Sequence, residues 1–244
     1  MDRKFIRSLQ IDWGKIEEGS YLQEIPVLKN ITSLEFQDNI TIFAGENGTG
    51  KSTLLEAIAT AYGFNPEGGS INYRFSTFDD VSPLSQGVRL TKGICRAASN
   101  YFFRAESFFN MATKAEDYRG FTPKEIFYAR YGGKSLHEQS HGESFLSYFQ
   151  SFHEPGLYLM DEPEAALSPQ CQLSLFLQIS KMAENGSQFI MASHSPILLG
   201  IPNAGIISFD GGELKRCNYQ DTESYQIMEM FINHRDALVK RLLD

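Results

Sequence analysis

The octet GENGTGKS, residues 45–52, combines residue types that can bind a phosphate group. It fits the pattern of glycine, four residues, glycine, lysine, and serine or threonine. Glycines let a chain curl until consecutive backbone N–H groups converge on one anion. Lys51 adds a positive charge for the β- and γ-phosphates, and the Ser52 hydroxyl can ligate Mg²⁺, which prefers hard oxygen ligands. The sequence therefore predicts a nucleotide-phosphate site with contacts from Gly45, Glu46, Asn47, Gly48, Thr49, Gly50, Lys51, Ser52 and Thr53.

An acidic pair and a histidine farther along the chain suit the same chemistry. Asp161 ends the apolar run LYLM and can hold Mg²⁺ through water, and Glu162 can polarise an attacking water as a general base. His194 follows the run QFIMAS, where it can hydrogen-bond a γ-phosphate. Taken alone, adjacent acids before a proline are common in loops, and a lone histidine is more often packed or on the surface. Because the acidic pair and the histidine each follow a short apolar run, we expect them near the octet. We therefore predict that Glu162, His194 and Lys51 are catalytic.

The stretch KSLHEQSHGESFLSY, residues 134–148, fits two kinds of site. His137 and His141 are four residues apart with glutamates nearby, which suits a metal site. Ser140 and Glu143 instead have the Ser-x-x-Glu spacing of a helix capping box, and an apolar helix face continues beyond them. A helix that begins after Ser140 leaves His137 outside the one-turn register with His141, which weighs against the metal site. The free N–H groups at the helix start, with Ser140 and Gly142, then form an anion site.

The elements that must position these residues indicate a mixed α/β domain. A strand over residues 40–44 leads into the octet, and an amphipathic helix leads out of it and ends at Gly63. Residues 156–164 and 187–195 contain short apolar runs that end in polar residues, as buried parallel strands do where they open onto a site. A helix from Pro169 to just before Gly186 joins them.

The remaining segments give weaker patterns. Residues 5–15 and 31–36 predict edge strands, YFFRAESFF predicts a strand, and residues 204–219 predict a hairpin that turns at Asp210, Gly211 and Gly212. The tail after Tyr225 predicts a helix. Residues 64–100 are rich in Gly, Ser, Asn and Asp, and we expect them to be irregular.

The composition excludes several classes of protein. The 244 residues are 42% hydrophobic and 21% charged, as in ordinary globular proteins rather than disordered or fibrous ones. No apolar run approaches the roughly 20 residues needed to cross a bilayer, and the first residues lack the apolar centre of a secretory signal. The three cysteines are far apart, which predicts reduced thiols rather than disulfides or a zinc site. These features predict a cytoplasmic protein without a membrane span.

The net charge bears on partners. At −8, it opposes generic binding of a polyanion, although a local basic patch stays compatible with nucleic-acid contact. Nucleic acid is therefore not indicated, and a protein partner is expected.

In this order, the motifs resemble those of the ATP-binding-cassette superfamily, in particular its soluble branch of SMC-like and recombination-repair ATPases. The matches are GENGTGKS for the Walker A loop, LYLMDEPEAALSP for Walker B and the D-loop, and SHSP for the switch histidine. Within that branch the chain is similar to small bacterial AAA-family ATPases that share FFRAESFF, HEQSHGES and DEPEAALSP. The resemblance implies a P-loop α/β fold with a mostly parallel mixed sheet flanked by helices, an antiparallel β edge, and a helical subdomain that carries the signature.

The resemblance also implies ATP and Mg²⁺ as ligands and a homodimer that sandwiches ATP head to tail. Ser140 and Gly142 lie where the signature of one subunit would touch the γ-phosphate held by the other. Residues 1–244 would form one ATPase domain. Its RecA-like core would span about 1–63 and 153–244, and its helical or irregular subdomain about 64–152.

Some positions depart from the superfamily pattern. His141 and Glu143 replace small residues of the signature, and Ser168 stands where the D-loop usually has an acid. These changes leave ATP binding intact and bear on the rate and symmetry of dimer closure.

Two family contacts have no obvious residue. Gln86 lies in the irregular region, so Glu106 is our preferred substitute for the metal-contacting glutamine, and Arg104 is the alternative that would meet phosphate. Tyr21 is the candidate adenine platform, with Phe5 and Trp13 equally available and more often core residues.

Three functions follow as hypotheses. The first is a Mg²⁺-dependent ATPase whose ATP-driven closure acts on a protein or nucleic acid. The second is an ATP-controlled binding module with negligible turnover. The third is the nucleotide-binding subunit of a transporter. A long coiled coil that would tether DNA is absent, because only 88 residues separate Lys51 from Ser140 (140 − 51 − 1) and no sustained heptads occur there.

Overall fold

The computed structural model describes residues 4–71, 82–105, 107, 108, 113, 116 and 122–243. The strands are β1 (Ile6–Ile11), β2 (Ser33–Glu35), β3 (Ile40–Ala44), β4 (Val88–Lys92), β5 (Ser99–Arg104), β6 (Gly156–Asp161), β7 (Gln188–Ala192), β8 (Ala204–Ser208) and β9 (Lys215–Cys217). The α-helices are α1 (Pro26–Lys29), α2 (Lys51–Tyr62), α3 (Leu84–Gly87), α5 (Lys124–Ala129), α6 (His141–Gln150), α7 (Pro169–Glu184), α8 (Pro196–Leu199) and α9 (Glu223–Leu243).

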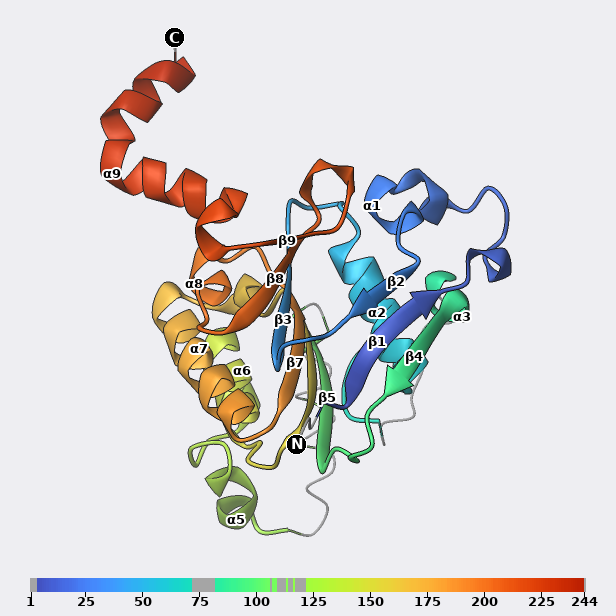
Figure 1. Cartoon of the computed structure of the whole chain (residues 1–244). Helices are drawn as coiled ribbons and strands as arrows, with labels where there is room; N and C mark the ends of the chain where they lie inside the picture. Colours follow the sequence, from blue (N-terminus) through green and yellow to red (C-terminus); the bar gives the residue numbers. More distant parts are fainter. Residues whose placement is uncertain are drawn as a thin grey trace.

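A six-stranded sheet in the order β5-β6-β7-β3-β8-β9 forms the centre of the fold (Figure 1). All its strands run parallel except β9, which pairs antiparallel with β8. Helices α6, α7 and α8 pack on one face, and α2 packs on the other. The predicted fold class, a mixed and mostly parallel sheet flanked by helices, is confirmed.

Side chains of the sheet alternate between two cores, as the period of a strand requires. In β6, Tyr158 and Met160 join the core beneath α6 and α7, whereas Leu157 and Leu159 join the core beneath α2. Both faces of β6 are therefore buried, which explains why its sequence is a continuous apolar run rather than an alternating one.

A second sheet, in the order β2-β1-β4, is the predicted antiparallel edge. The expectation that residues 64–100 are irregular is wrong for α3, β4 and the start of β5. In β4 only Val88 and Leu90 face inward, and the exposed Arg89 and Thr91 alternate with them. Two apolar residues are too short a pattern to separate a strand from a loop. Pairing with β1 supplies the missing stabilisation.

The helix that follows the phosphate loop has the predicted ends. Gly63, with φ +117°, caps the carboxyl end of α2, and its N–H donates to the carbonyls of Ala59 and Thr60. Leu54, Leu55 and Ile58 are fully buried on the inner face. This packing fixes the amino end of α2 against the sheet, where a bound anion would meet its dipole.

The predicted division into a core and a helical subdomain stays a prediction. Strands β4 and β5 come from the range 64–152, yet they pair with β1 and β6 of the predicted core.

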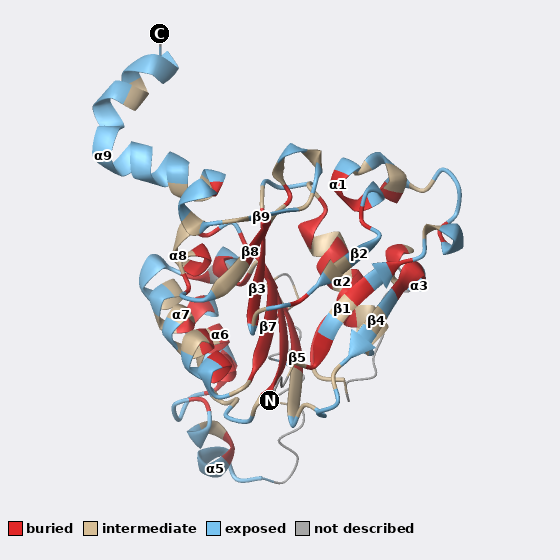
Figure 2. Ribbon diagram, viewed as in Figure 1, coloured by how far each residue is buried: buried red, intermediate tan, exposed pale blue. Residues whose placement is uncertain are grey.

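Helix α9 projects from the body of the molecule and buries no residue (Figure 2). A kink at His234 divides it, with φ −134° and ψ 33° there. Within the part of the chain that the structure describes, no helix has the length and apolarity to cross a bilayer.

Candidate nucleotide-binding site

The carboxyl ends of four parallel strands lie in register at one edge of the central sheet. Arg104 of β5 pairs with Asp161 of β6, Asp161 pairs with Ala192 of β7, and Ala192 pairs with Phe43 of β3. The segments that follow these strands therefore start side by side. In an open α/β sheet this is the edge where ligands bind.

Backbone hydrogen bonds continue past the strand ends and hold the predicted motifs together. Glu162 N–H donates to Ala192 O at 3.0 Å, and Ser193 N–H donates to Phe43 O at 3.0 Å. The acidic pair, the segment before His194 and the start of the phosphate loop are thus joined by main chain. The structure brings the Walker A, Walker B and histidine segments together, and the roles of their side chains stay predictions.

The phosphate loop adopts a conformation that depends on its glycines. Gly45, Gly48 and Gly50 have φ values of +142°, +81° and +100°, where side chains are strained. A Cβ on Gly50 would also lie 3.0 Å from Leu28 Cγ, and one on Gly45 would lie 2.9 Å from Asp210 Oδ1. Glycine is needed at Gly45 and Gly50 for both conformation and space.

Lys51 lies folded into the loop at the start of α2. It is only 3% exposed, and its Nζ donates to the carbonyls of Gly45 and Glu46 at 2.7 and 2.6 Å. The pKa of Lys51 is lowered from 10.5, and burial of the ammonium is the largest cause. Four nearby carboxylates act in the opposite direction: Glu162, Asp210, Asp161 and Glu164.

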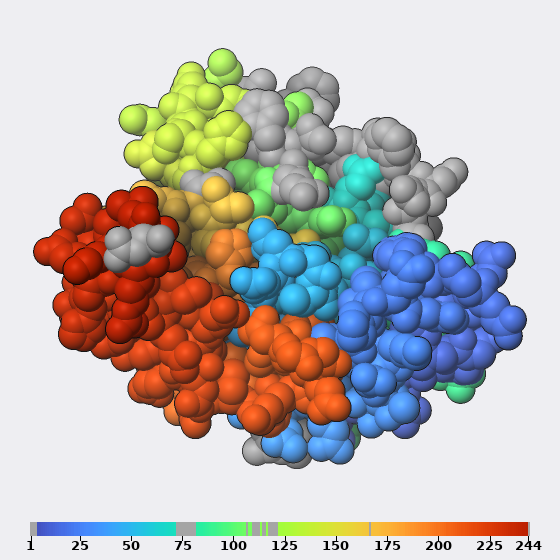
Figure 3. All heavy atoms as spheres, turned by 90° about the horizontal axis from the view of Figure 1, so that it is seen from above, coloured from blue at the N-terminus to red at the C-terminus, as the bar shows by residue number. Residues whose placement is uncertain are grey.

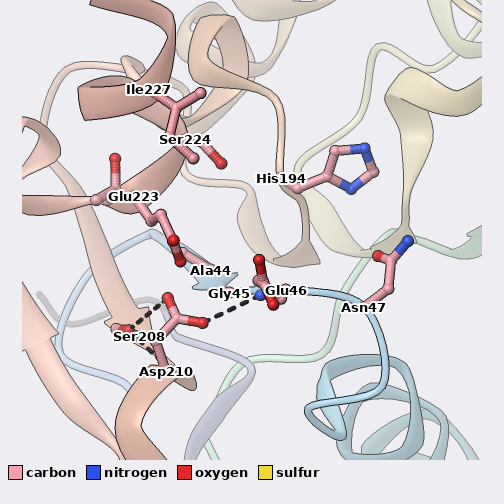
Figure 4. Close-up of a pocket in the computed structure, with 11 residues that line it drawn as sticks. Ala44, Gly45, Glu46, Asn47, His194, Ser208, Asp210, Glu223, Ser224 and Ile227 are labelled. Carbon is pink, nitrogen blue, oxygen red and sulfur yellow. Dashed lines mark hydrogen bonds between the residues drawn. The ribbon is translucent and has the colours of Figure 1, made fainter. Parts of the chain in front are cut away.

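The turn after β8 supports the loop from its other side. Asp210 Oδ1 accepts a hydrogen bond from Glu46 N–H at 3.1 Å, and Asp210 N–H donates to Ser208 Oγ (Figure 4). A pocket between this turn, the loop and the first turn of α9 is lined by Glu46, Asn47 and His194. Seen from above, the light-blue region around the loop borders both the blue amino-terminal residues and the orange region that follows β8 (Figure 3).

Glu162 has a strained backbone. Its φ of +46° lies in the left-handed region, which is unfavourable for a residue with a side chain. The preceding Asp161 is 8% exposed. Left-handed residues of this kind cluster at functional sites, where the surrounding structure holds them. This turn directs the chain from β6 toward Pro163–Ala166.

Two site residues were missed by reading the sequence. Glu164 is 6% exposed and accepts hydrogen bonds from Ser193 Oγ and from the N–H groups of His194 and Ser195. Ile25, with its neighbour Pro26, lines a second pocket that borders Asn47, Gly48 and Thr49. Nothing in the local sequence marks either position, because each acts through a contact with a distant segment.

Tyr21, the predicted adenine platform, is 53% exposed at the start of a 3-10 turn, Tyr21–Glu24. Of its alternatives, Phe5 is 4% exposed, and Trp13 donates from Nε1 to Ile31 O. Phe5 is thus a core residue. The role of Tyr21 stays a prediction.

Arg104 is the alternative predicted to meet phosphate, and that role stays a prediction. Its guanidinium donates to Glu56 Oε2 at 3.0 Å and to Pro66 O at 2.8 Å, and its Nε lies 3.8 Å from Asp161 Oδ2. Glu106, the predicted metal ligand, lies outside the described residues.

The start of α6 has the predicted capping box. Ser140 Oγ accepts from Glu143 N–H at 3.4 Å, and the Glu143 carboxylate accepts from Ser140 N–H at 3.0 Å. His137 lies in a separate 3-10 turn, Leu136–Glu138. It is therefore outside the helix that contains His141, as predicted. Among the residues described, no group of three or more His, Cys, Asp or Glu side chains could hold a metal ion.

Ser168, which replaces the usual acid of the D-loop, has a structural role. Its Oγ accepts a hydrogen bond from Cys171 N–H at 3.3 Å and caps the amino end of α7. Pro169 follows at the first helical position. The serine is therefore a helix cap in this chain.

Known proteins match this chain over its motif-bearing parts. Residues 19–119 match a family model described as "AAA domain", and residues 144–200 match one described as "AAA domain, putative AbiEii toxin, Type IV TA system". A curated relative, ABC transporter G family member 6 of Arabidopsis thaliana, is 25% identical over 229 residues. That match covers 80% of this chain and 29% of the relative, so the chain spans less than a third of the relative's length.

Solved structures also match. One is cbiO1 from Clostridium perfringens, part of the ABC transporter complex cbiONQ, at 16% identity and a TM-score of 0.48, covering 96% of this chain and 97% of that one. Another is the SMC head domain from Thermotoga maritima, at 13% identity and a TM-score of 0.43, covering 88% of this chain and 98% of that one.

The first AAA-domain match contains the phosphate loop, and the second contains Asp161 and His194. The same motifs converge on one edge of a mostly parallel sheet. Both parts of the chain that contain the predicted motifs are therefore similar to AAA domains.

Proposed function

We propose that this chain binds and hydrolyses ATP with Mg²⁺ as a head-to-tail homodimer, and that its closure acts on a partner protein or nucleic acid. The observation that carries the proposal is the convergence of Lys51, Asp161, Glu162 and His194 at the carboxyl ends of β3, β6 and β7. Such an edge provides phosphate binding, metal binding and a general base within one site.

The residues present fit a bound triphosphate. The loop has the glycine conformations that expose backbone N–H groups, and α2 directs its positive end at the same place. The buried ammonium of Lys51 lies among carboxylates that a divalent cation would help to balance. The donor set of Ser52 and Asp161, with hard oxygen atoms, suits Mg²⁺.

Each residue then has a defined task. Lys51 would donate to the β- and γ-phosphate oxygens, and Ser52 with Asp161 would hold the metal. Glu162 would accept the proton of the attacking water, and His194 would donate to the γ-phosphate. Bound Mg-ATP supplies the phosphoanhydride bond and the cation that neutralises charge developing on it.

An apolar surface beside the loop suits the base of the nucleotide. Ile25 is half-buried and Pro26 is exposed, and both border Gly48 and Thr49 of the loop. A flat base can pack on such a surface while its phosphates reach the loop. We therefore assign the adenine contact to Ile25 and Pro26 in addition to Tyr21.

The dimer would complete the site from the partner's α6. Ser140 is exposed, and the capping box leaves the first turn of α6 as an ordered, positively polarised end. Ser140 and Gly142 of one subunit would thus meet the γ-phosphate held by the other.

The proposal is tested by comparing wild type with Glu162→Gln. We expect the variant to bind ATP, to release phosphate at least about 100-fold more slowly because the general base is gone, and to accumulate as an ATP-bound dimer. The control is Glu184→Gln, which neutralises an exposed acid at the end of α7 and should leave turnover unchanged. Wild-type phosphate release by Glu162→Gln would exclude this residue as the base.

A binding module with negligible turnover is the second candidate, and the helix-capping role of Ser168 favours it. A D-loop without its acid would let ATP close the dimer while hydrolysis stays slow. This candidate predicts tight ATP binding with no phosphate release from wild type under any partner condition.

A further inference from the structure

Glu164 connects the turn after β6 to the segment that carries His194. It lies in the 3-10 turn Pro163–Ala166, two residues after the predicted general base. One oxygen, Oε1, accepts from Ser193 Oγ at 2.8 Å, from His194 N–H at 2.7 Å and from Ser195 N–H at 3.0 Å. A buried carboxylate with three donors on one oxygen fixes the backbone of this segment.

The same carboxylate lies against the imidazole. His194 Nδ1 is 3.5 Å from Glu164 Oε1, and the other oxygen, Oε2, is buried with no hydrogen-bond partner among the described residues. The Glu164 side chain is 5% exposed, whereas the His194 side chain is 46% exposed and borders the pocket beside Gly45 and Asn47. The ring therefore has Nδ1 close to a buried acceptor, and it lines a pocket that it shares with residues of the phosphate loop.

We infer that Glu164 is a positioning residue that sets the orientation and the tautomer of His194. An ionised carboxylate only accepts hydrogen bonds, so it favours a proton on Nδ1 of the neighbouring ring. With Nδ1 directed at Glu164, Nε2 is the nitrogen left to face the pocket. This inference rests on the proposed function, because it assigns Nε2 to the γ-phosphate.

A simpler alternative is that Glu164 only tethers the loop. A second residue that tethers the same segment, Gln172, allows the positioning and tethering explanations to be separated. Gln172 Oε1 accepts from Ser195 Oγ at 2.6 Å, and Gln172 also donates to Leu167 O, so it holds the same segment. If tethering alone matters, loss of Gln172 should have the same effects as loss of the Glu164 carboxylate.

The first test reads the imidazole directly, without nucleotide. Protein labelled with ¹⁵N-histidine has five side chains to resolve, and His194→Gln identifies the signal of His194 by its loss. At a pH where the ring is neutral, we expect the Nδ1–H tautomer in wild type. Glu164→Gln keeps an oxygen for the backbone donors but removes the negative charge that favours a proton on Nδ1, so the population should shift toward the Nε2–H tautomer. Gln172→Ala should leave the tautomer unchanged.

The second test separates kcat from KM. Glu164→Gln should lower kcat by about ten-fold, a typical effect of removing a partner behind a site residue, while the KM for ATP changes less than about three-fold. Glu164 also contributes to the electrostatic field at Lys51, so ATP affinity is measured separately by calorimetry. Gln172→Ala should keep the wild-type kcat.

Two results would overturn the inference. One is a His194 tautomer that is the same in wild type and Glu164→Gln. The other is an equal loss of kcat in Glu164→Gln and Gln172→Ala. Absence of ATP turnover in wild type, with the tautomer shift still present, would instead count against the proposed function and leave the positioning of His194 standing.

Discussion

Arg104 and Asp161 occupy paired positions at the ends of neighbouring parallel strands, with Arg104 Nε 3.8 Å from Asp161 Oδ2. The same guanidinium donates to Glu56 Oε2 on α2 at 3.0 Å. One arginine therefore connects the helix of the phosphate loop to the acid that is predicted to bind metal. The three side chains are largely buried, so the pairing is only weakly screened by solvent.

Removing this arginine should destabilise the protein. Arg104→Ala leaves Glu56 and Asp161 as uncompensated acids in a largely buried place, so we expect a loss of about 2 kcal/mol in the free energy of unfolding. Added Mg²⁺ should restore part of the lost free energy of unfolding by binding the uncompensated acids. Urea denaturation with and without Mg²⁺ measures both effects.

Arg89→Ala is the matched control for that experiment. Arg89 pairs with Asp12 at 3.5 Å, but both side chains are largely exposed, so its loss should cost less than about 0.5 kcal/mol. Equal destabilisation by the two substitutions would contradict the role given to Arg104.

The left-handed backbone at Glu162 should cost stability. Asn tolerates this region better than Gln does, so Glu162→Asn should be more stable than Glu162→Gln by up to about 1 kcal/mol. Both variants lack the carboxylate and should be equally inactive. The difference in their stability therefore measures the cost of the left-handed backbone conformation. Differential scanning calorimetry measures it. A less stable Glu162→Asn would mean that the strain is absent.

The two loop glycines Gly48 and Gly50 should respond differently to alanine. Both have positive φ, but a Cβ on Gly50 would also press on Leu28 and Ile25, whereas one on Gly48 has nothing within 4 Å. Gly50→Ala should therefore lose more thermal stability and more ATP affinity than Gly48→Ala. Thermal shift with and without ATP tests this, and equal effects would argue against the packing of Gly50 on α1.

The capping box at α6 should depend on pH. Hydrogen bonds from the Ser140 side chain and backbone lower the pKa of Glu143 below 4.5. The stabilisation from this carboxylate is present above pH 4.5 and is lost as the pH falls through the lower, folded-state pKa. A carboxyl ¹³C titration should show the low pKa in wild type and a higher one in Ser140→Ala. An unchanged pKa in Ser140→Ala would contradict the capping box.

Sequence reading predicted those parts of the site that local patterns encode. The phosphate loop is bounded by an apolar strand and an amphipathic helix, and Ser140 and Glu143 are close in the chain, so each signal lies within one segment. The same reasoning placed Asp161 and His194 at strand ends, because a buried parallel strand is a continuous apolar run.

The parts that sequence reading missed depend on distant contacts. Glu164 acts on His194 only because the ends of β6 and β7 are neighbours in the sheet. Ile25 borders the loop because α1 packs beside it, and β4 is a strand because β1 supplies its hydrogen bonds. No residue within these segments indicates which distant segment it contacts. Such contacts can be predicted only once the pairing of the strands is known.

In the proposed dimer, ATP is held by the phosphate loop of one copy and enclosed by a second copy. The most direct test is the molar mass of Glu162→Gln by light scattering, with Mg-ATP and without nucleotide. We expect a change from 27.6 kDa to about twice that mass on addition of Mg-ATP, and no change when Lys51→Met is added to the same protein. A mass that stays at the monomer value while calorimetry reports saturating ATP would contradict it.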